Sequence, residues 1–180
     1  MSAAEKMSMR YDLAQDRIKL VGQRGDIVPT LWLTQRLLSR LVVPIFEWLE
    51  SLDTEPNGGK DSAAKARQQH AALSQLNPGP AAPQPQKAPA RALGQHSEAG
   101  GDFLVREIDV RRSDSEIMLI FQLSNRQTVR IPFREDQLRR WLNALYKLWR
   151  QAEWRNEVWP DWMHKAMIKQ LEISNRDPVH

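Results

Sequence analysis

The feature that most constrains this chain is a similarity between two segments that lie far apart in the sequence. Residues 31–46 and 131–146 carry apolar side chains at matching positions when they are compared at an offset of 100. The matching pairs are Leu31 with Ile131, Leu33 with Phe133, Leu38 with Leu138, Leu41 with Trp141, Ile45 with Leu145 and Phe46 with Tyr146. Similarity at a fixed offset is typical of a duplicated supersecondary unit. The sequence therefore predicts a degenerate internal repeat.

Each copy of the repeat is expected to contain three strands followed by one helix. Polar and apolar residues alternate with a period of two, as in half-buried strands, and turn-forming residues separate the alternating runs. The expected strands are residues 9–13, 18–20 and 30–33 in the first copy and 105–110, 117–123 and 128–133 in the second. Both copies are therefore predicted to be βββα units.

The helix of each unit is predicted from an apolar stripe with helical spacing. Thr34 is expected to be the N-cap of the first helix. Pro44 removes a backbone donor within that helix and is expected to kink it. The stripes are Leu38, Leu41, Val42, Ile45 and Leu49 in the first helix and Leu138, Trp141, Leu142, Leu145, Leu148 and Ala152 in the second.

A segment of different composition separates the two units. Residues 54–102 hold six of the eleven prolines and no aromatic side chain. Such a segment cannot bury enough apolar surface to offset the entropy lost on ordering it. It is expected to be a long, disordered Pro/Ala/Gln-rich linker, in which residues 61–76 favour a short helix. The predicted organisation is a first unit at 1–53, the linker at 54–102, a second unit at 103–156 and a C-terminal helix and tail at 157–180.

A unit of about 45 residues is too small to close a core comfortably by itself. The fold class is therefore expected to be α+β, with the two units packed as one body of antiparallel sheets and amphipathic helices. The sheets would join edge to edge, or the helices would pack together. Two independent units on a string, or a homodimer in which each unit packs against its copy, are the alternatives.

Several function classes lack support in the sequence. Cysteine is absent, which excludes disulfides and thiolate metal sites. Glu135 and Asp136 are explained by the helix dipole at a helix start. The histidines have no metal-ligand spacing; they are His70, His96, His164 and His180. We therefore expect no metal, no cofactor and no enzymatic activity.

The chain is also expected to lie in the cytoplasm. No run of about 18 apolar residues is present, and the N-terminal residues lack the apolar region of a secretory signal. The net charge of +4 comes from 26 basic and 22 acidic residues. Since the two signs are interleaved, the charge mostly predicts a soluble surface rather than a phosphate-attracting field.

Four of the seven tryptophans lie in the stretch WRQAEWRNEVWPDWM, residues 149–163. Pro160 is expected to begin a short amphipathic helix, because proline is well tolerated at the first helical position. Two interpretations remain open. The helix folds back over the protein's own core with Trp159 and Trp162 as pins, or it docks into the groove of a partner.

The first functional hypothesis is a non-enzymatic binding, adaptor or regulatory protein that contacts another protein, or a second copy of itself. Tryptophan, tyrosine and arginine are enriched at the centres of protein interfaces. The candidate partner-binding residues are Tyr146, Lys147, Trp149, Arg150, Trp154, Arg155, Trp159 and Trp162.

The alternative hypothesis is a nucleic-acid-binding module with a preference for single strands. Aromatic rings would stack on bases, and sheet arginines would meet phosphates. The candidate arginines are Arg111, Arg112, Arg126, Arg130 and Arg134. Strands followed by an amphipathic helix, in two copies, resemble in topology the single-stranded nucleic-acid-binding folds of the whirly and purine-rich-element-binding families. This resemblance covers about half of the chain and assigns no residue role.

Overall fold

The computed structural model describes residues 6–23, 29–52, 62–74, 86–87 and 101–174, and the structural statements below concern these residues. The strands are β1 (Lys6–Asp12), β2 (Arg17–Gln23), β3 (Pro29–Leu33), β4 (Gln86–Lys87), β5 (Gly101–Arg112), β6 (Glu116–Leu123) and β7 (Thr128–Arg134). The helices are α1 (Gln35–Leu52), α2 (Ser62–Ser74), α3 (Glu135–Gln151) and α4 (Asp161–Ser174).

One sheet runs through both halves of the chain in the order β4-β1-β2-β3-β5-β6-β7. Strands β1 to β3 form one antiparallel meander, and β5 to β7 form another. The meanders meet edge to edge through a parallel pairing, in which Leu31 lies opposite Phe103. The expectation of antiparallel sheets was therefore wrong at this junction, because the last strand of one meander meets the first strand of the next in the same direction.

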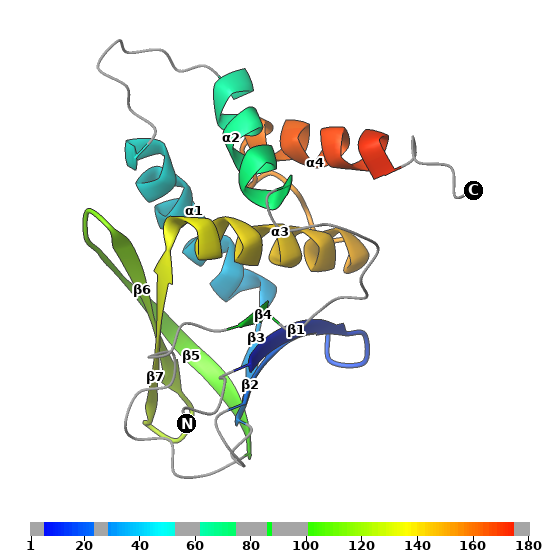
Figure 1. Ribbon diagram of the computed structural model, residues 1–180. Helices are drawn as coiled ribbons and strands as arrows, with labels where there is room; N and C mark the ends of the chain where they lie inside the picture. Colours follow the sequence, from blue (N-terminus) through cyan, green and yellow to red (C-terminus); the bar gives the residue numbers. More distant parts are fainter. Residues whose placement is uncertain (1–5, 24–28, 53–61, 75–85, 88–100, 175–180) are drawn as a thin grey trace.

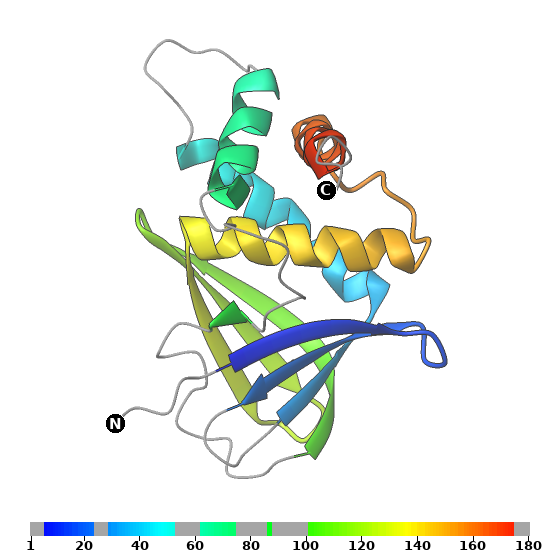
Figure 2. The same ribbon diagram turned by 45° about the vertical axis from the view of Figure 1, so that its right-hand side comes forward.

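The molecule has three layers (Figures 1 and 2). Helices α1 and α3 cross one another over the same face of the sheet. Helices α2 and α4 lie on the far side of α1 and α3 from the sheet. The opposite face of the sheet has no described helix over it, and we call it the open sheet face.

The core forms where the apolar side of both meanders meets α1 and α3. The alternation that predicted the strands places Leu20, Leu31, Leu119 and Ile131 on this side, and all four are buried. Leu13, which was expected to belong to β1, instead lies in the turn before β2 and is 83% exposed. The strand ends at Asp12 because the carboxylate of Asp12 accepts a hydrogen bond from the backbone N–H of Gln15, 3.0 Å away, and so closes the turn.

Helix α1 confirms the predicted N-cap and apolar stripe. The backbone N–H of Leu37 donates to the Thr34 hydroxyl at 3.4 Å. The whole stripe is buried, and the helix continues through Pro44. The indole N–H of Trp48 donates to the carbonyl of Ser113 at 2.8 Å, which ties α1 to the turn between β5 and β6.

Helix α3 is buried on a wider surface than its apolar stripe predicts. Leu138, Trp141 and Leu142 pack in the core, as expected, whereas Arg139, Tyr146 and Trp149 are buried as well. Arg139 is covered by α2 through Gln69, and Tyr146 is covered by α4 through His164. Trp149 packs against Trp154 and Trp159, in the segment between α3 and α4. A second helix layer cannot be inferred from the periodicity of α3 alone.

Helix α2 lies inside the interval that was predicted to be a linker. It falls within the range in which a short helix was expected, and Ala66 and Gln69 are buried. Three stretches of that interval lie outside the described residues, namely 54–61, 75–85 and 88–100. The turn-forming residues 24–26, between the second and third expected strands, lie outside them as well. No helix in the described part of the chain is long and apolar enough to cross a membrane.

Candidate functional site

The tryptophans at the C-terminal end do not form an exposed patch. Trp149, Trp154, Trp159 and Trp162 are all buried, and so is Tyr146. Among the predicted partner-binding residues, only Lys147, Arg150 and Arg155 are exposed. The expectation of a Trp/Arg-rich surface is therefore corrected, because its aromatic part faces the interior of this chain.

Edge-to-face contacts account for this burial. The Tyr146 and Trp159 ring centroids are 4.9 Å apart, and those of Trp149 and Trp154 are 5.1 Å apart. Phe46 of α1 meets Trp162 of α4 at 5.6 Å. Such geometry stabilises aromatic pairs beyond their buried area. The C-terminal helix thus closes the protein's own core, which was one of the two interpretations left open.

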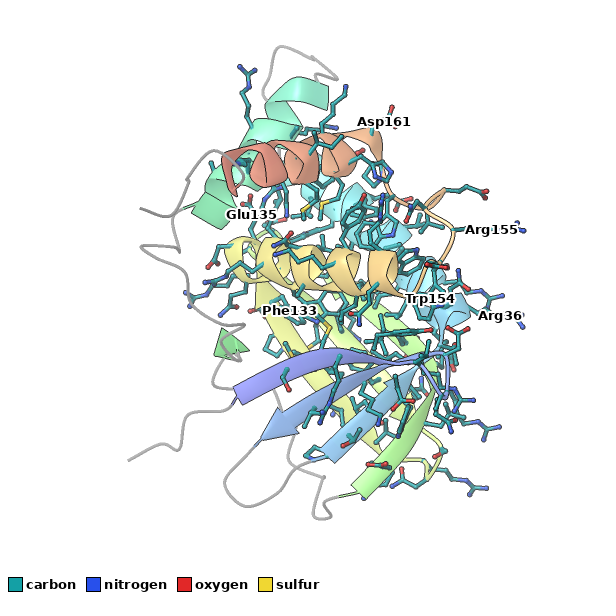
Figure 3. All side chains as sticks on the ribbon, turned by 90° about the vertical axis from the view of Figure 1, so that its right-hand side faces the viewer. Arg36, Phe133, Glu135, Trp154, Arg155 and Asp161 are labelled. Carbon is teal, nitrogen blue, oxygen red and sulfur yellow. The ribbon has the colours of Figure 1, made fainter. Side chains whose placement is uncertain are left out.

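Three of these indole N–H groups donate hydrogen bonds, and two of the bonds join segments that are distant in the sequence. Trp149 donates to the carbonyl of Arg155 at 2.9 Å, and Trp162 donates to Glu50 at 3.1 Å. Trp154 donates to Asp16 of the β1–β2 turn at 2.8 Å. In Figure 3, Trp154 lies beside the end of α3, whereas Arg155 points outward. The tryptophan cluster therefore joins the C-terminal segment to the β1–β2 turn and to α1.

Trp32 is the one tryptophan of the seven that is not buried. It stands in the third strand, PTLWL, whose residues alternate between buried and half-buried. Leu31 and Leu33 point into the core, so Trp32 points to the open sheet face. A half-buried tryptophan on a sheet face without a covering helix leaves part of a large aromatic ring accessible to a ligand.

The register of the sheet places Trp32 in a row of four side chains across four strands. Arg10 lies opposite Lys19, Lys19 opposite Trp32, and Trp32 opposite Leu104. Arg17 lies on β2 two residues before Lys19, so its side chain is on the same face of the sheet as that of Lys19. We call Arg10, Arg17, Lys19, Trp32 and Leu104 the Trp32 site. It combines an aromatic ring with three cationic side chains.

Lys19 covers part of the Trp32 ring. Its Nζ lies 4.2 Å from the ring centroid, which is the geometry of a cation–π contact. The same Nζ forms an ion pair with the Asp12 carboxylate at 2.7 Å. This hydrogen bond from Lys19 is the main cause of a lowered pKa for Asp12, and it outweighs the opposing effect of desolvation. Asp12 is therefore charged at neutral pH.

The five arginines of the nucleic-acid hypothesis all lie in the second meander, but they do not share one face of the sheet. Arg111, Arg130 and Arg134 are exposed on the open sheet face. Arg126 lies in the β6–β7 turn with a φ of 68°. Arg112 points to the other face, where it forms an ion pair with Glu47 of α1 at 2.9 Å. The structure therefore removes Arg112 from this set.

Acidic residues accompany the remaining arginines on this half of the open sheet face. Glu107 and Asp109 stand on β5, and Glu116 lies directly opposite Arg134. Mixed signs do not build a field that attracts phosphates. The stronger basic surface is the Trp32 site, where Asp12 is already paired with Lys19 and the exposed Asp102 lies opposite Thr30.

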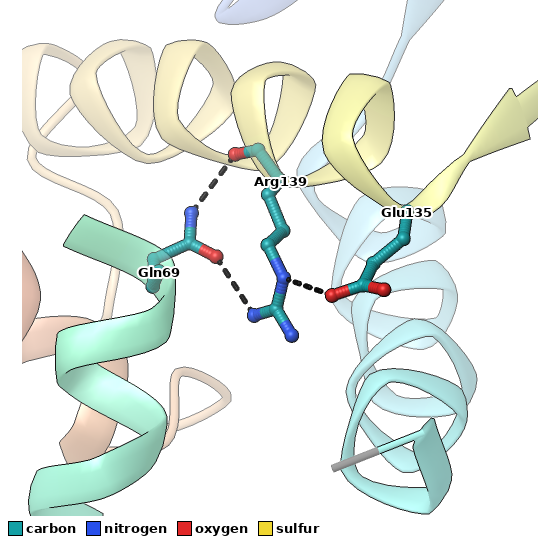
Figure 4. A network of polar contacts seen from close by, with 3 residues as sticks. All are labelled: Gln69, Glu135 and Arg139. Carbon is teal, nitrogen blue, oxygen red and sulfur yellow. Dashed lines mark hydrogen bonds and ion pairs between the residues drawn. The ribbon is translucent and has the colours of Figure 1, made fainter. Parts of the chain in front are cut away.

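A polar network lies between α2 and α3 (Figure 4). Gln69 Nε2 donates to the carbonyl of Arg139 at 2.9 Å, and Arg139 Nη1 donates to Gln69 Oε1 at 3.2 Å. Arg139 Nε also donates to Glu135 at 2.9 Å. Since Gln69 and Arg139 are both buried, this network fixes α2 on α3 and offers no binding surface.

The described residues contain no group of three or more acidic, histidine or cysteine side chains placed to hold a metal ion. Comparison of the chain with protein-family models, with curated proteins and with solved structures finds no match.

Proposed function

We propose that this protein is a non-enzymatic binding protein that holds single-stranded nucleic acid on its open sheet face. The observation that carries the proposal is the position of Trp32, the one tryptophan outside the core, beside Arg10, Arg17 and Lys19. Single-stranded nucleic acid is bound by basic surfaces that follow the backbone and by aromatic rings on which bases stack. The Trp32 site supplies both kinds of contact.

Two of the cations are available to phosphates. Arg10 is exposed and Arg17 is half-buried, and neither makes an ion pair with a carboxylate in the part of the chain that the structure describes. Further along the same face, Arg130 and Arg134 would extend the contact with the backbone. Acidic residues between the two groups of arginines favour a short binding site centred on Trp32.

The protein-contact hypothesis remains the competing proposal. Its aromatic residues are buried, and its exposed residues, Lys147, Arg150 and Arg155, lack an exposed ring among them. These cations lie on or after α3, in the helical part of the molecule. The two proposals therefore place the functional surface on different sides of the protein.

We further propose that the two halves arose by duplication of one βββα unit. In support, each antiparallel meander leads directly into a helix, β3 into α1 and β7 into α3. The matching pairs Leu31 with Ile131 and Leu33 with Phe133 occupy buried positions in the third strand of each meander.

Titration with single- and double-stranded oligonucleotides at two salt concentrations tests the function. Binding through phosphates weakens with salt, with a slope of about 0.7 per contact for single strands. The double substitution Arg10→Ala with Arg17→Ala is expected to lower this slope by about 1.4 and to weaken binding. Lys147→Ala with Arg150→Ala removes the same charge from α3 and serves as the matched control.

The control variant is expected to bind oligonucleotides as the native protein does. An absence of oligonucleotide binding would contradict the proposed function and would leave a protein partner as the favoured class. Equal losses in both double variants would show that net charge alone governs binding, and the Trp32 site would then have no special role.

A further inference from the structure

The Trp32 ring is already occupied in the free protein. Lys19 Nζ lies 4.2 Å from the ring centroid, close to the distance at which the plane of a stacked base would lie. A base that stacks on this face of the indole must therefore displace the ammonium group. The site that we propose for nucleic acid contains its own competing ligand.

Asp12 holds Lys19 in this place. The carboxylate lies 2.7 Å from Lys19 Nζ, and both side chains are about one quarter exposed, at 24% and 23%. The β1–β2 turn holds the Asp12 carboxylate in place, because the N–H of Gln15 donates to Asp12 Oδ1 at 3.0 Å. The three side chains therefore form an ordered stack in which Asp12 orients Lys19 and Lys19 covers Trp32.

We propose that Lys19 is a displaceable latch on Trp32, which an incoming base of a single-stranded nucleic acid replaces. This inference rests on the proposed function. When the base stacks on the indole, the Lys19 ammonium leaves the ring and pairs with a phosphate of the same strand. The ligand thereby exchanges one cation–π contact for a stacking contact and a charge-assisted hydrogen bond.

Weak bonds keep the latch reversible. A partly exposed ion pair and a partly exposed cation–π contact each contribute on the order of 1 kcal/mol, so a ligand can replace both. Asp12 sets the strength of the latch because its carboxylate holds Lys19 over the ring. Asp12 itself does not touch the base. It is a positioning residue that lowers affinity for the ligand.

The test compares two Asp→Asn variants in the full chain. Asp12→Asn releases Lys19 and retains an acceptor for the Gln15 N–H. Asp102→Asn removes the same charge from an exposed residue of the same sheet face. Asp102 lies on β5 two residues before Leu104, the residue opposite Trp32. We expect Asp12→Asn to bind a single-stranded oligonucleotide about fivefold more tightly than Asp102→Asn, the effect of one ion pair near the protein surface.

Two substitutions of Trp32 identify the stacking contact. Trp32→Phe keeps an aromatic face and is expected to keep most of the binding. Trp32→Leu keeps an apolar side chain without a ring and is expected to weaken binding by at least about fivefold. Circular dichroism of each variant confirms that the fold is retained.

The outcomes separate the latch from the proposed function. Equal affinities of the two Asp→Asn variants, with binding intact, overturn the latch alone. Equal affinities of the Trp32→Phe and Trp32→Leu variants overturn stacking on Trp32. If no variant binds any oligonucleotide, the proposed function and the latch fall together.

Discussion

Asp16 joins the β1–β2 turn to the segment that follows α3. Its Oδ1 accepts hydrogen bonds from the Tyr11 hydroxyl and from the Trp154 indole, both at 2.8 Å. The hydrogen bond to Asp16 is the main cause of a raised pKa for Tyr11, because ionised Tyr11 would lose this bond and face the carboxylate. This contribution to stability is fully present below the usual pKa of 10.0 and is lost as the pH rises through the higher, folded-state value.

Asp16→Asn tests this assignment. The amide removes the negative charge, retains an acceptor for Trp154 and tolerates the φ of 48° at this position. We expect the pKa of Tyr11 to fall toward its usual value. Ultraviolet titration of tyrosinate measures it, in a Tyr146→Phe background so that only Tyr11 titrates. An unchanged titration midpoint in the Asp16→Asn protein would contradict the role of this carboxylate.

Single residues also show what the sequence can tell about a site. Trp32 stands between Leu31 and Leu33, and simple alternation assigns it to the opposite face of the strand. This local signal was present in the sequence, but the predicted site fell on the clustered tryptophans, and Trp32 was missed. The clustered tryptophans were harder to assign, because clustering in sequence does not distinguish a core from a surface. Their burial depends on Phe46, Glu50 and Asp16, which are more than 100 residues distant from their partners.

At the scale of elements, α2 depends on one buried polar contact. Gln69 is fully buried and exchanges two hydrogen bonds with Arg139. Gln69→Ala leaves buried donors and acceptors of Arg139 without this partner, so we expect a loss of about 1–3 kcal/mol in the free energy of unfolding. Denaturant unfolding measures it.

Gln68→Ala is the matched control for this helix. Gln68 precedes Gln69 on α2 and is exposed. Its substitution is expected to change the free energy of unfolding by no more than about 0.5 kcal/mol. Equal effects of the two substitutions would mean that the network does not hold α2 in place.

The elements were predicted to different extents, for physical reasons. Periodicity found the strands of both meanders, α1, α3 and α4, because each of these has apolar residues at the spacing of its own secondary structure. Helix α2 has few apolar side chains, and it packs through alanine and glutamine. Composition therefore predicted a linker for the interval 54–102, which contains α2. The parallel pairing of β3 with β5 also escaped prediction, because no local pattern specifies which strand edges meet.

At the scale of the whole molecule, the two halves share one core. Buried residues of β1 to β3 and of β5 to β7 belong to a single cluster with α1, α3 and α4. The β3–β5 pairing continues the sheet across the junction. Unfolding either half would expose apolar surface of the other, so we expect one cooperative transition rather than two.

Two substitutions, one in each half, test this cooperativity. Leu20 of β2 and Leu119 of β6 are both buried, at 2% and 0% exposure. Leu20→Ala and Leu119→Ala are each expected to cost about 2–5 kcal/mol, through lost burial and the cavity that remains. Because the core is shared, each substitution should shift the midpoint of the same single transition, followed in parallel by tryptophan fluorescence and far-ultraviolet circular dichroism. Independent units would instead give two transitions, and each substitution would then move only the transition of its own half.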